Sequence, residues 1–171
     1  SWEQTGDTLT FKLRQGVKWQ DIAPVNGRAL TSEDIKYSYE RLVTKSAEYV
    51  HAYKLDPVDS LTTPDPQTVV MKLKFPSAGL LADLASGQGM GIIPRELVEA
   101  DGSLDKRWIG TGPFSLEGWE KGSRIRFKKN PTYFRAGQPY LDSVEVQFIA
   151  DESTALSNFL AKKLHYLDSF N

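Results

Sequence analysis

Hydrophobic and polar residues alternate in several short segments of this chain, which is the pattern of half-buried β-strands. In residues 8–13, Leu9, Phe11 and Leu13 share one face, while the residues between them are polar. Residues 68–75 repeat the pattern, and the residues expected to point inward there are Val69, Met71, Leu73 and Phe75. Both segments are bounded by turn-forming residues. The first half of the chain is therefore expected to contain a sheet.

Helical spacing replaces the alternation between these strands. After Thr31, the apolar residues Ile35, Tyr39 and Leu42 recur on one face of an expected helix. Glu33 and Asp34 lie in its first turn, where the helix dipole favours negative charge. We therefore interpret this acidic pair as a helix start rather than as a catalytic dyad. A second helix is predicted over residues 95–100, where Pro94 begins it and Gly102 stops it.

The last third of the chain predicts a different arrangement. Residues 114–116 and 125–127 indicate a hairpin. Val144 and Val146 alternate with polar residues, Asp151 begins a helix, and residues 164–167 indicate one more strand. That order predicts a βαβ unit with a parallel crossover. A boundary near residues 103–108 divides the chain into a small α/β region, residues 1–106, and a second region, residues 107–171.

Composition excludes several classes of protein. The 171 residues carry a net charge of −1, with 21 basic and 22 acidic residues, so no nucleic-acid partner is expected. Cysteine is absent, which excludes disulfides, thiolate zinc sites and a cysteine nucleophile. No apolar run has the length of a membrane span. The sequence starts at Ser1 without an apolar leader, so we expect any signal peptide to have been removed or to lie outside it.

No motif in the sequence indicates a reaction. The two histidines, His51 and His165, are far apart, and no carboxylate lies at a spacing that suggests a metal site. The glycines Gly87, Gly89 and Gly91 resemble a phosphate loop only in part, because no helix start and no Lys-Ser/Thr pair follow them. A mobile connection is the favoured interpretation. We therefore expect no catalytic residue, no metal and no cofactor.

One group of aromatic residues suits two roles. Trp19, Tyr49, Tyr53 and Trp119 each combine an apolar ring with a polar tip. Such residues lie at the rim of a core or in a ligand cleft. The rim is the favoured role, and the cleft remains the alternative.

Six motifs, in order, carry a resemblance to a known family. They are residues 1–3, 10–19, 30–38, 110–114 (Gly-Thr-Gly-Pro-Phe), 130–134 (Asn-Pro-Thr-Tyr-Phe) and 140–142 (Tyr-Leu-Asp). Together they resemble the extracytoplasmic solute-binding proteins of ABC importers, family 5, the oligopeptide, dipeptide and nickel type. The chain departs from this pattern in two places. The loop over residues 20–29 is longer than usual, and Lys162 stands where the family has a glycine.

The resemblance implies a fold and a function. The fold is α/β, part of a type II periplasmic-binding-protein-like fold with mixed sheets and flanking helices, and its second lobe is absent from this sequence. Residues 107–171 then form part of the first lobe. The intact protein would capture a peptide or similar solute by hinge closure and deliver it to an ABC permease. It would work in the periplasm or outside the cell of a bacterium or archaeon, and would meet the membrane only through the permease or a lipid anchor.

The resemblance also indicates where a ligand would be held. Cleft-facing residues are expected after the first helix and in the glycine-rich crossing, at Tyr49, Tyr53, Gly87, Gly89 and Gly91. The absent parts would leave apolar edges uncovered, so the isolated chain is expected to self-associate and to bind no peptide measurably.

Two other classes of function stay open from the residues alone. One is a small α/β hydrolase with an unrecognised site, and the other is a scaffold or interaction domain. Within the solute-binding reading, the ligand is a peptide, a nickel chelate or an oligosaccharide, because a fold does not fix its ligand.

Overall fold

The alternating segments of the first half pair into one antiparallel sheet. The computed structural model describes residues 1–44, 49–87 and 89–167, and its four-stranded sheet has the order β1-β2-β4-β3. The strands are β1 Trp2–Thr5, β2 Thr8–Lys12, β3 Val58–Asp65 and β4 Thr68–Leu73. The β2–β4 pairing places Leu9 opposite Met71 and Phe11 opposite Val69. The predicted inward residues of the two strands therefore meet across the ladder.

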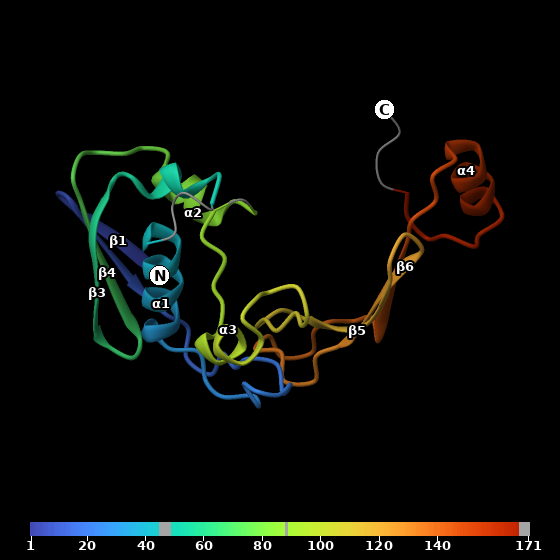
Figure 1. The fold of residues 1–171 in the computed structure, drawn as a ribbon, viewed down its shortest axis with the longest axis horizontal. Coiled ribbons are helices and arrows are strands. Elements are labelled where there is room, and N and C mark those ends of the chain that lie inside the picture. Colours follow the sequence, from blue (N-terminus) through green and yellow to red (C-terminus); the bar gives the residue numbers. More distant parts are fainter. Residues whose placement is uncertain (45–48, 88, 168–171) are drawn as a thin grey trace.

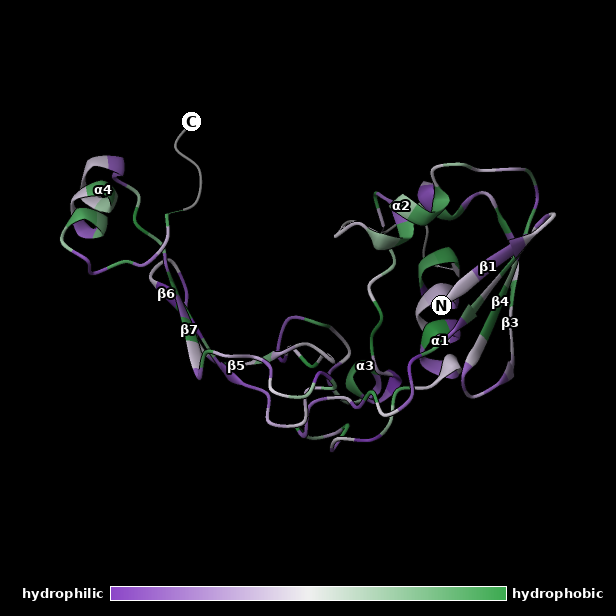
Figure 2. Cartoon of the chain, turned by 180° about the vertical axis from the view of Figure 1, so that it is seen from behind, coloured by the Kyte–Doolittle hydropathy of each residue, from purple (hydrophilic) through white to green (hydrophobic). Residues whose placement is uncertain are grey.

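Helix α1 (Ser32–Thr44) packs against β3 and β4 and closes the main core. Its residues Ile35 and Tyr39 are buried in one cluster with Leu9, Met71 and Leu80. The hydrophobic positions on α1 and β4 can be followed in Figure 2. The helix face that the sequence predicted as apolar is thus the face that contacts the sheet.

Three short helices surround this unit. They are the 3₁₀ helix η2 Ala52–Leu55, α2 Leu80–Ala85 and α3 Arg95–Asp101. Pro94 precedes α3 and Gly102 ends it, as predicted, although the helix runs one residue further than expected. Gly102 takes the left-handed conformation with φ 71°. A second core forms beside α3 from Trp19, Val25, Leu97 and Ile109. Ile109, just beyond the predicted boundary at residues 103–108, thereby packs against residues from before that boundary.

The remaining strands form a narrow sheet that leads away from the first unit (Figure 1). Strands β5 (Phe114–Glu120), β6 (Arg124–Lys129) and β7 (Ser143–Gln147) pair antiparallel in that order. The hairpin prediction is confirmed. Helix α4 (Glu152–Leu160) follows, and the Asp151 carboxylate accepts a hydrogen bond from the Thr154 amide at 2.8 Å, as expected of an N-cap.

Two expectations from the sequence are wrong. Residues 164–167 form no strand and no strand pairing, so within the described ranges β7 and α4 are not part of a βαβ unit. A strand needs a neighbour to accept and donate its backbone hydrogen bonds, and no described strand pairs with this segment. Phe75 is 51% exposed rather than inward, because β4 ends at Leu73.

No helix in the described part of the chain has both the length and the hydropathy needed to cross a membrane.

Candidate functional site

An apolar pocket of about 280 Å³ lies between the second half of α1, η2, α2 and residues 89–93. Its hydrophobic walls are formed by Leu42, Val50, Leu55, Met90, Ile93 and Leu104. Ligand pockets are usually apolar clefts of about 300–1,000 Å³ with a few polar groups. This pocket lies just below that range, so it can hold one large side chain or a similar group rather than a whole peptide.

The polar groups of the pocket are mostly paired. The Lys54 ammonium lies 3.4 Å from the Asp83 carboxylate and donates a hydrogen bond to the Ser86 hydroxyl at 3.3 Å. The Arg41 guanidinium lies 5.2 Å from the centre of the Tyr49 ring, a cation–π contact. The buried Nδ1 of His51 has no hydrogen-bond partner among the described residues. His51 lines the pocket, and its Nδ1 is thus a buried polar atom that the described residues leave unsatisfied.

The structure brings together three of the five residues that the sequence indicated as ligand contacts. Tyr49, Gly89 and Gly91 line the pocket, together with His51. Tyr53 does not line it; its side chain is 61% exposed, and its ring lies 6.3 Å from that of His51.

Gly87 also lies outside the pocket lining, and it precedes residue 88, which the structure does not describe. The sequence reasoning missed the pocket's hydrophobic walls. Those walls come from four separate segments, and the pattern within any one segment indicates only that it is buried somewhere.

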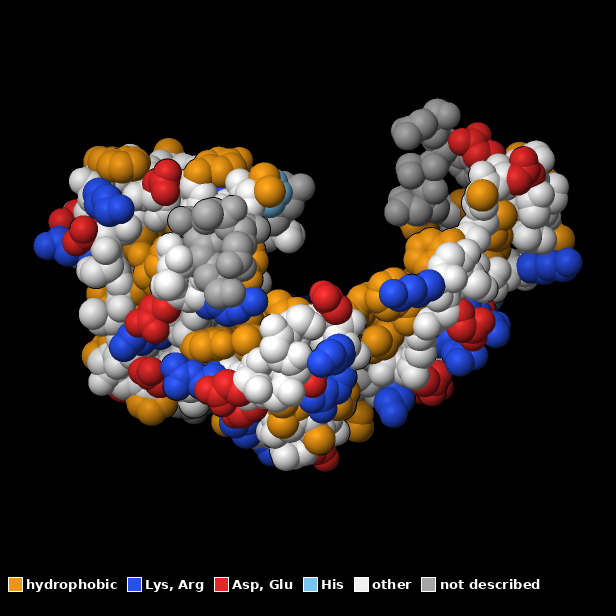
Figure 3. All heavy atoms as spheres, in the orientation of Figure 1, with side chains coloured by type: hydrophobic (Ala, Val, Ile, Leu, Met, Phe, Trp, Pro, Cys, Tyr) orange, Lys and Arg blue, Asp and Glu red, His pale blue; other side chains and the backbone are white. Residues whose placement is uncertain are grey.

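The other aromatic candidates take different places. Trp19 is fully buried in the second core, whereas Trp119 is 44% exposed and contacts Trp108 with ring centres 5.3 Å apart and ring planes tilted by 44°. A shallow apolar groove of about 330 Å³ runs beside Trp108 and is lined by Leu97, Ile109, Phe114, Leu116 and Phe127, among others. Figure 3 shows hydrophobic side chains on this side of the hairpin, turned toward the hollow of the arc.

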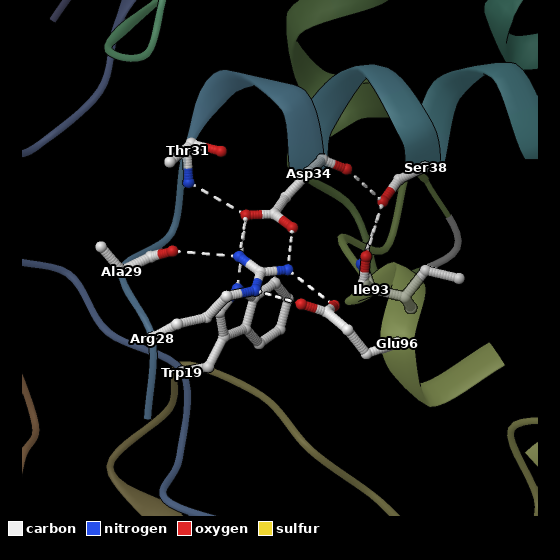
Figure 4. A network of polar contacts seen from close by, with 8 residues as sticks. All are labelled: Trp19, Arg28, Ala29, Thr31, Asp34, Ser38, Ile93 and Glu96. Carbon is white, nitrogen blue, oxygen red and sulfur yellow. Dashed lines mark hydrogen bonds and ion pairs between the residues drawn. The ribbon is translucent and has the colours of Figure 1, made fainter. Parts of the chain in front are cut away.

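A network of charged side chains ties the start of α1 to α3 (Figure 4). Arg28 binds the carboxylates of both Asp34 and Glu96. The hydrogen bonds that Arg28 donates, first to Asp34 and then to Glu96, raise the pKa of Arg28 above its usual value. The hydrogen bond from Arg28 likewise lowers the pKa of Glu96. The sequence does not indicate this network, because Glu96 is separated from Arg28 by 68 residues.

The acidic pair that the sequence placed at the start of α1 therefore has a structural role. The Asp34 carboxylate accepts the Thr31 backbone N–H at 2.9 Å, which satisfies one free amide of the helix end. It also accepts the Trp19 indole N–H at 3.3 Å.

In the described part of the pocket no nucleophile is hydrogen-bonded to a base. The Ser38 hydroxyl donates to the Asp34 carbonyl at 2.7 Å and accepts the Ile93 amide at 3.0 Å. His165 is exposed after α4. Across the residues that the structure describes, no three His, Cys, Asp or Glu side chains are grouped as a metal site would need. The arrangement suits the binding of a solute by shape and a few polar contacts.

Comparison with known proteins places the whole chain in one group. Residues 1–171 match the family model described as bacterial extracellular solute-binding proteins, family 5 middle. The dipeptide-binding protein of Escherichia coli is 33% identical over 172 aligned residues, which cover 89% of this chain and 32% of that protein. A putative ABC transporter peptide-binding protein of Brucella ovis is 31% identical over 169 aligned residues, which cover 95% of this chain and 31% of that protein.

Solved structures agree with this assignment. AgaA from Agrobacterium tumefaciens R10, in complex with agropinic acid, is 30% identical with a TM-score of 0.84. The superposition covers 96% of this chain and 33% of the AgaA chain. DppA from Helicobacter pylori, in complex with the peptide STSA, is 26% identical with a TM-score of 0.83. The superposition covers 96% of this chain and 36% of the DppA chain. The chain thus spans about a third of the length of the curated relatives it matches.

Proposed function

Because this chain belongs to the bacterial extracellular solute-binding proteins of family 5, we propose that it forms part of a protein that captures a peptide or similar solute. That protein would hold the solute outside the cytoplasmic membrane of a bacterium or archaeon and deliver it to an ABC permease. The observation that carries the proposal is the family match over all 171 residues. The named relatives are transport binding proteins, so the proposal includes no covalent step.

The pocket between α1, η2, α2 and residues 89–93 is proposed as one subsite for the solute. Its apolar walls can bury a side chain of the ligand, and burial of such a side chain stabilises a complex by about 1.5–3 kcal/mol. Tyr49, Gly89 and Gly91 would contact that side chain. Tyr53 and Gly87 are proposed to contact the ligand outside the pocket, once the intact protein has closed around it.

Closure would follow from differential binding. A ligand that contacts both lobes stabilises the closed state more than the open state, and it shifts the population by that difference. This chain would supply one side of the cleft. Most of the polar contacts to a ligand would then come from residues outside it, which agrees with the mostly paired charges of the pocket.

Peptides are the favoured ligand class. The curated relatives that cover most of this chain are described as peptide-binding or dipeptide-binding proteins. The solved relative AgaA holds agropinic acid instead, so membership of the fold family does not by itself select a peptide.

A thermal-shift screen of the intact protein that carries this sequence tests the proposal. Di- to pentapeptides, nickel chelates and sugars are added separately at rising concentrations. A ligand that binds only the folded state at 100 times its Kd adds about 2.7 kcal/mol to the free energy of unfolding. We expect at least one peptide to raise the melting temperature. A rise in melting temperature with a sugar or a nickel chelate, but with no peptide, would contradict the peptide assignment.

We also propose that the isolated 171-residue chain self-associates. Several large hydrophobic side chains of the second sheet and α4 are exposed, among them Trp119, Val146, Phe148 and Leu160. Exposed apolar patches of this kind favour association.

A further inference from the structure

Two side chains of α1 are linked to the segment that leads into α3, Ser38 directly and Asp34 through Arg28. Asp34 and Ser38 are four residues apart in α1, so they lie on the same face of the helix one turn from each other. Figure 4 shows Ser38 pointing toward Ile93, and the Asp34 carboxylate pointing toward Arg28, which also binds Glu96. Ile93 lines the pocket, and the rest of that wall, including Met90 and Gly91, comes directly before it in the chain.

The first anchor is ionic and is centred on Arg28. Its guanidinium donates to the two carboxylate oxygens of Asp34 at 2.6 and 2.9 Å. It also donates two hydrogen bonds to Glu96, one from Nη2 at 2.8 Å and one from Nε. The Asp34 side chain is only 5% exposed. One cation thus holds two carboxylates that would otherwise repel each other, and it does so in the bidentate geometry that a lysine cannot reproduce.

The second anchor is neutral and is centred on Ser38, which is almost fully buried. The Ser38 hydroxyl accepts the backbone N–H of Ile93 at 3.0 Å and donates to the backbone carbonyl of Asp34 at 2.7 Å. The backbone of the pocket wall is therefore tied to α1 at Ile93. Three residues further on, the side chain of Glu96 is tied to the same helix through Arg28 and Asp34.

We propose that Arg28 and Ser38 are positioning residues for the pocket, because together they fix residues 89–93 against α1. This inference rests on the proposed function, since it assigns a role to residues that support the proposed subsite. The wall needs such support because two glycines, Gly89 and Gly91, lie in it and lower its own stiffness. A wall held in place before binding spares the ligand the cost of ordering it.

The direct test weakens each anchor where the fold should survive. Glu96→Ala removes the link to α3 but leaves the buried Arg28–Asp34 pair intact, and alanine is a good helix former. Ser38→Ala removes the second link. Glu99→Ala is the matched control, because Glu99 is exposed on the same helix. Hydrogen exchange over residues 89–100 is measured in the intact protein without ligand.

We expect both anchor variants to exchange about tenfold faster over residues 89–100, because a lost hydrogen bond of this kind lowers the free energy of local opening. The four-stranded sheet should keep its protection. With a ligand from the thermal-shift screen, affinity should fall about threefold to tenfold, while Glu99→Ala leaves exchange and affinity unchanged.

Unchanged exchange in both anchor variants would overturn the inference, as would faster exchange without any loss of affinity. The exchange measurement needs no ligand. If the screen finds no ligand at all, the proposed function fails, and the exchange data still decide whether the anchors hold the segment.

Discussion

At the scale of single residues, position 89 leaves no room for a side chain. A Cβ atom built on Gly89 would overlap the backbone carbonyl oxygen of Asp83. That oxygen belongs to α2 and cannot move without the helix. We expect Gly89→Ala to lower the free energy of unfolding by about 1–3 kcal/mol, because the segment or the helix must shift. Urea unfolding measures the change.

Gly91→Ala is the matched control for that variant. A Cβ atom at position 91 meets no heavy atom within 4 Å. Its stability should therefore stay close to that of the unchanged chain, or rise slightly as the unfolded chain loses freedom. Equal destabilisation by the two variants would contradict the claim that the close approach to α2 is what excludes a side chain at position 89.

The sequence could predict some of these residues and not others. It indicated the glycines as a connection and the acids of α1 as a helix start, because both roles depend on local chemistry. It could not indicate that Asp34 shares Arg28 with Glu96, since that contact depends on how α3 packs against α1. The buried Nδ1 of His51 is likewise a property of the assembled pocket.

At the scale of elements, alternation and helical spacing predicted β2, β4, α1 and the β5–β6 hairpin correctly. Each of these elements buries one face, so the spacing of apolar residues within the element itself predicts its type. The predicted strand at residues 164–167 failed because a strand is defined by its partner. The apolar character of that segment was real, but no described strand pairs with it.

The second sheet has one apolar face that its register defines. Trp119 pairs with Ile125, Ile125 with Val146 and Phe127 with Val144, and these residues share one side of the sheet. Val146 is 41% exposed there. We expect the isolated chain to self-associate through this face, and Val146→Lys to weaken association about tenfold or more, because it removes buried apolar area. Sedimentation velocity over a range of concentrations measures this.

The neighbouring residue supplies the control for the opposite face. Gln147 lies next to Val146 in β7, and its side chain points to the other side of the sheet. Gln147→Lys should leave association unchanged. A chain that stays monomeric at all concentrations, or equal effects of the two lysines, would show that this face is not the contact.

At the scale of the whole molecule, the chain forms an arc with the four-stranded unit at one end and α4 at the other (Figure 1). The pocket lies in the first unit, and the apolar groove beside Trp108 lies where the arc turns into the second sheet. Family membership could be inferred from the order of short motifs along the chain. The pocket could not, because its walls come together only when four segments fold against one another.

The central claim is that the pocket between α1, η2, α2 and residues 89–93 receives part of a captured solute. Gly91→Leu tests it most directly, because Gly91 lines the pocket and a Cβ atom there meets no neighbour. The control is Glu99→Leu, because Glu99 is exposed on α3 and lies outside the pocket lining.

Calorimetric titration of the intact protein, with the peptide that gives the largest thermal shift, measures both variants. We predict that Gly91→Leu lowers the affinity about tenfold or more, because the new side chain fills space that the ligand needs, while stability without ligand stays the same. Glu99→Leu should leave the affinity unchanged. An unchanged affinity in Gly91→Leu would contradict the claim that this pocket holds the ligand.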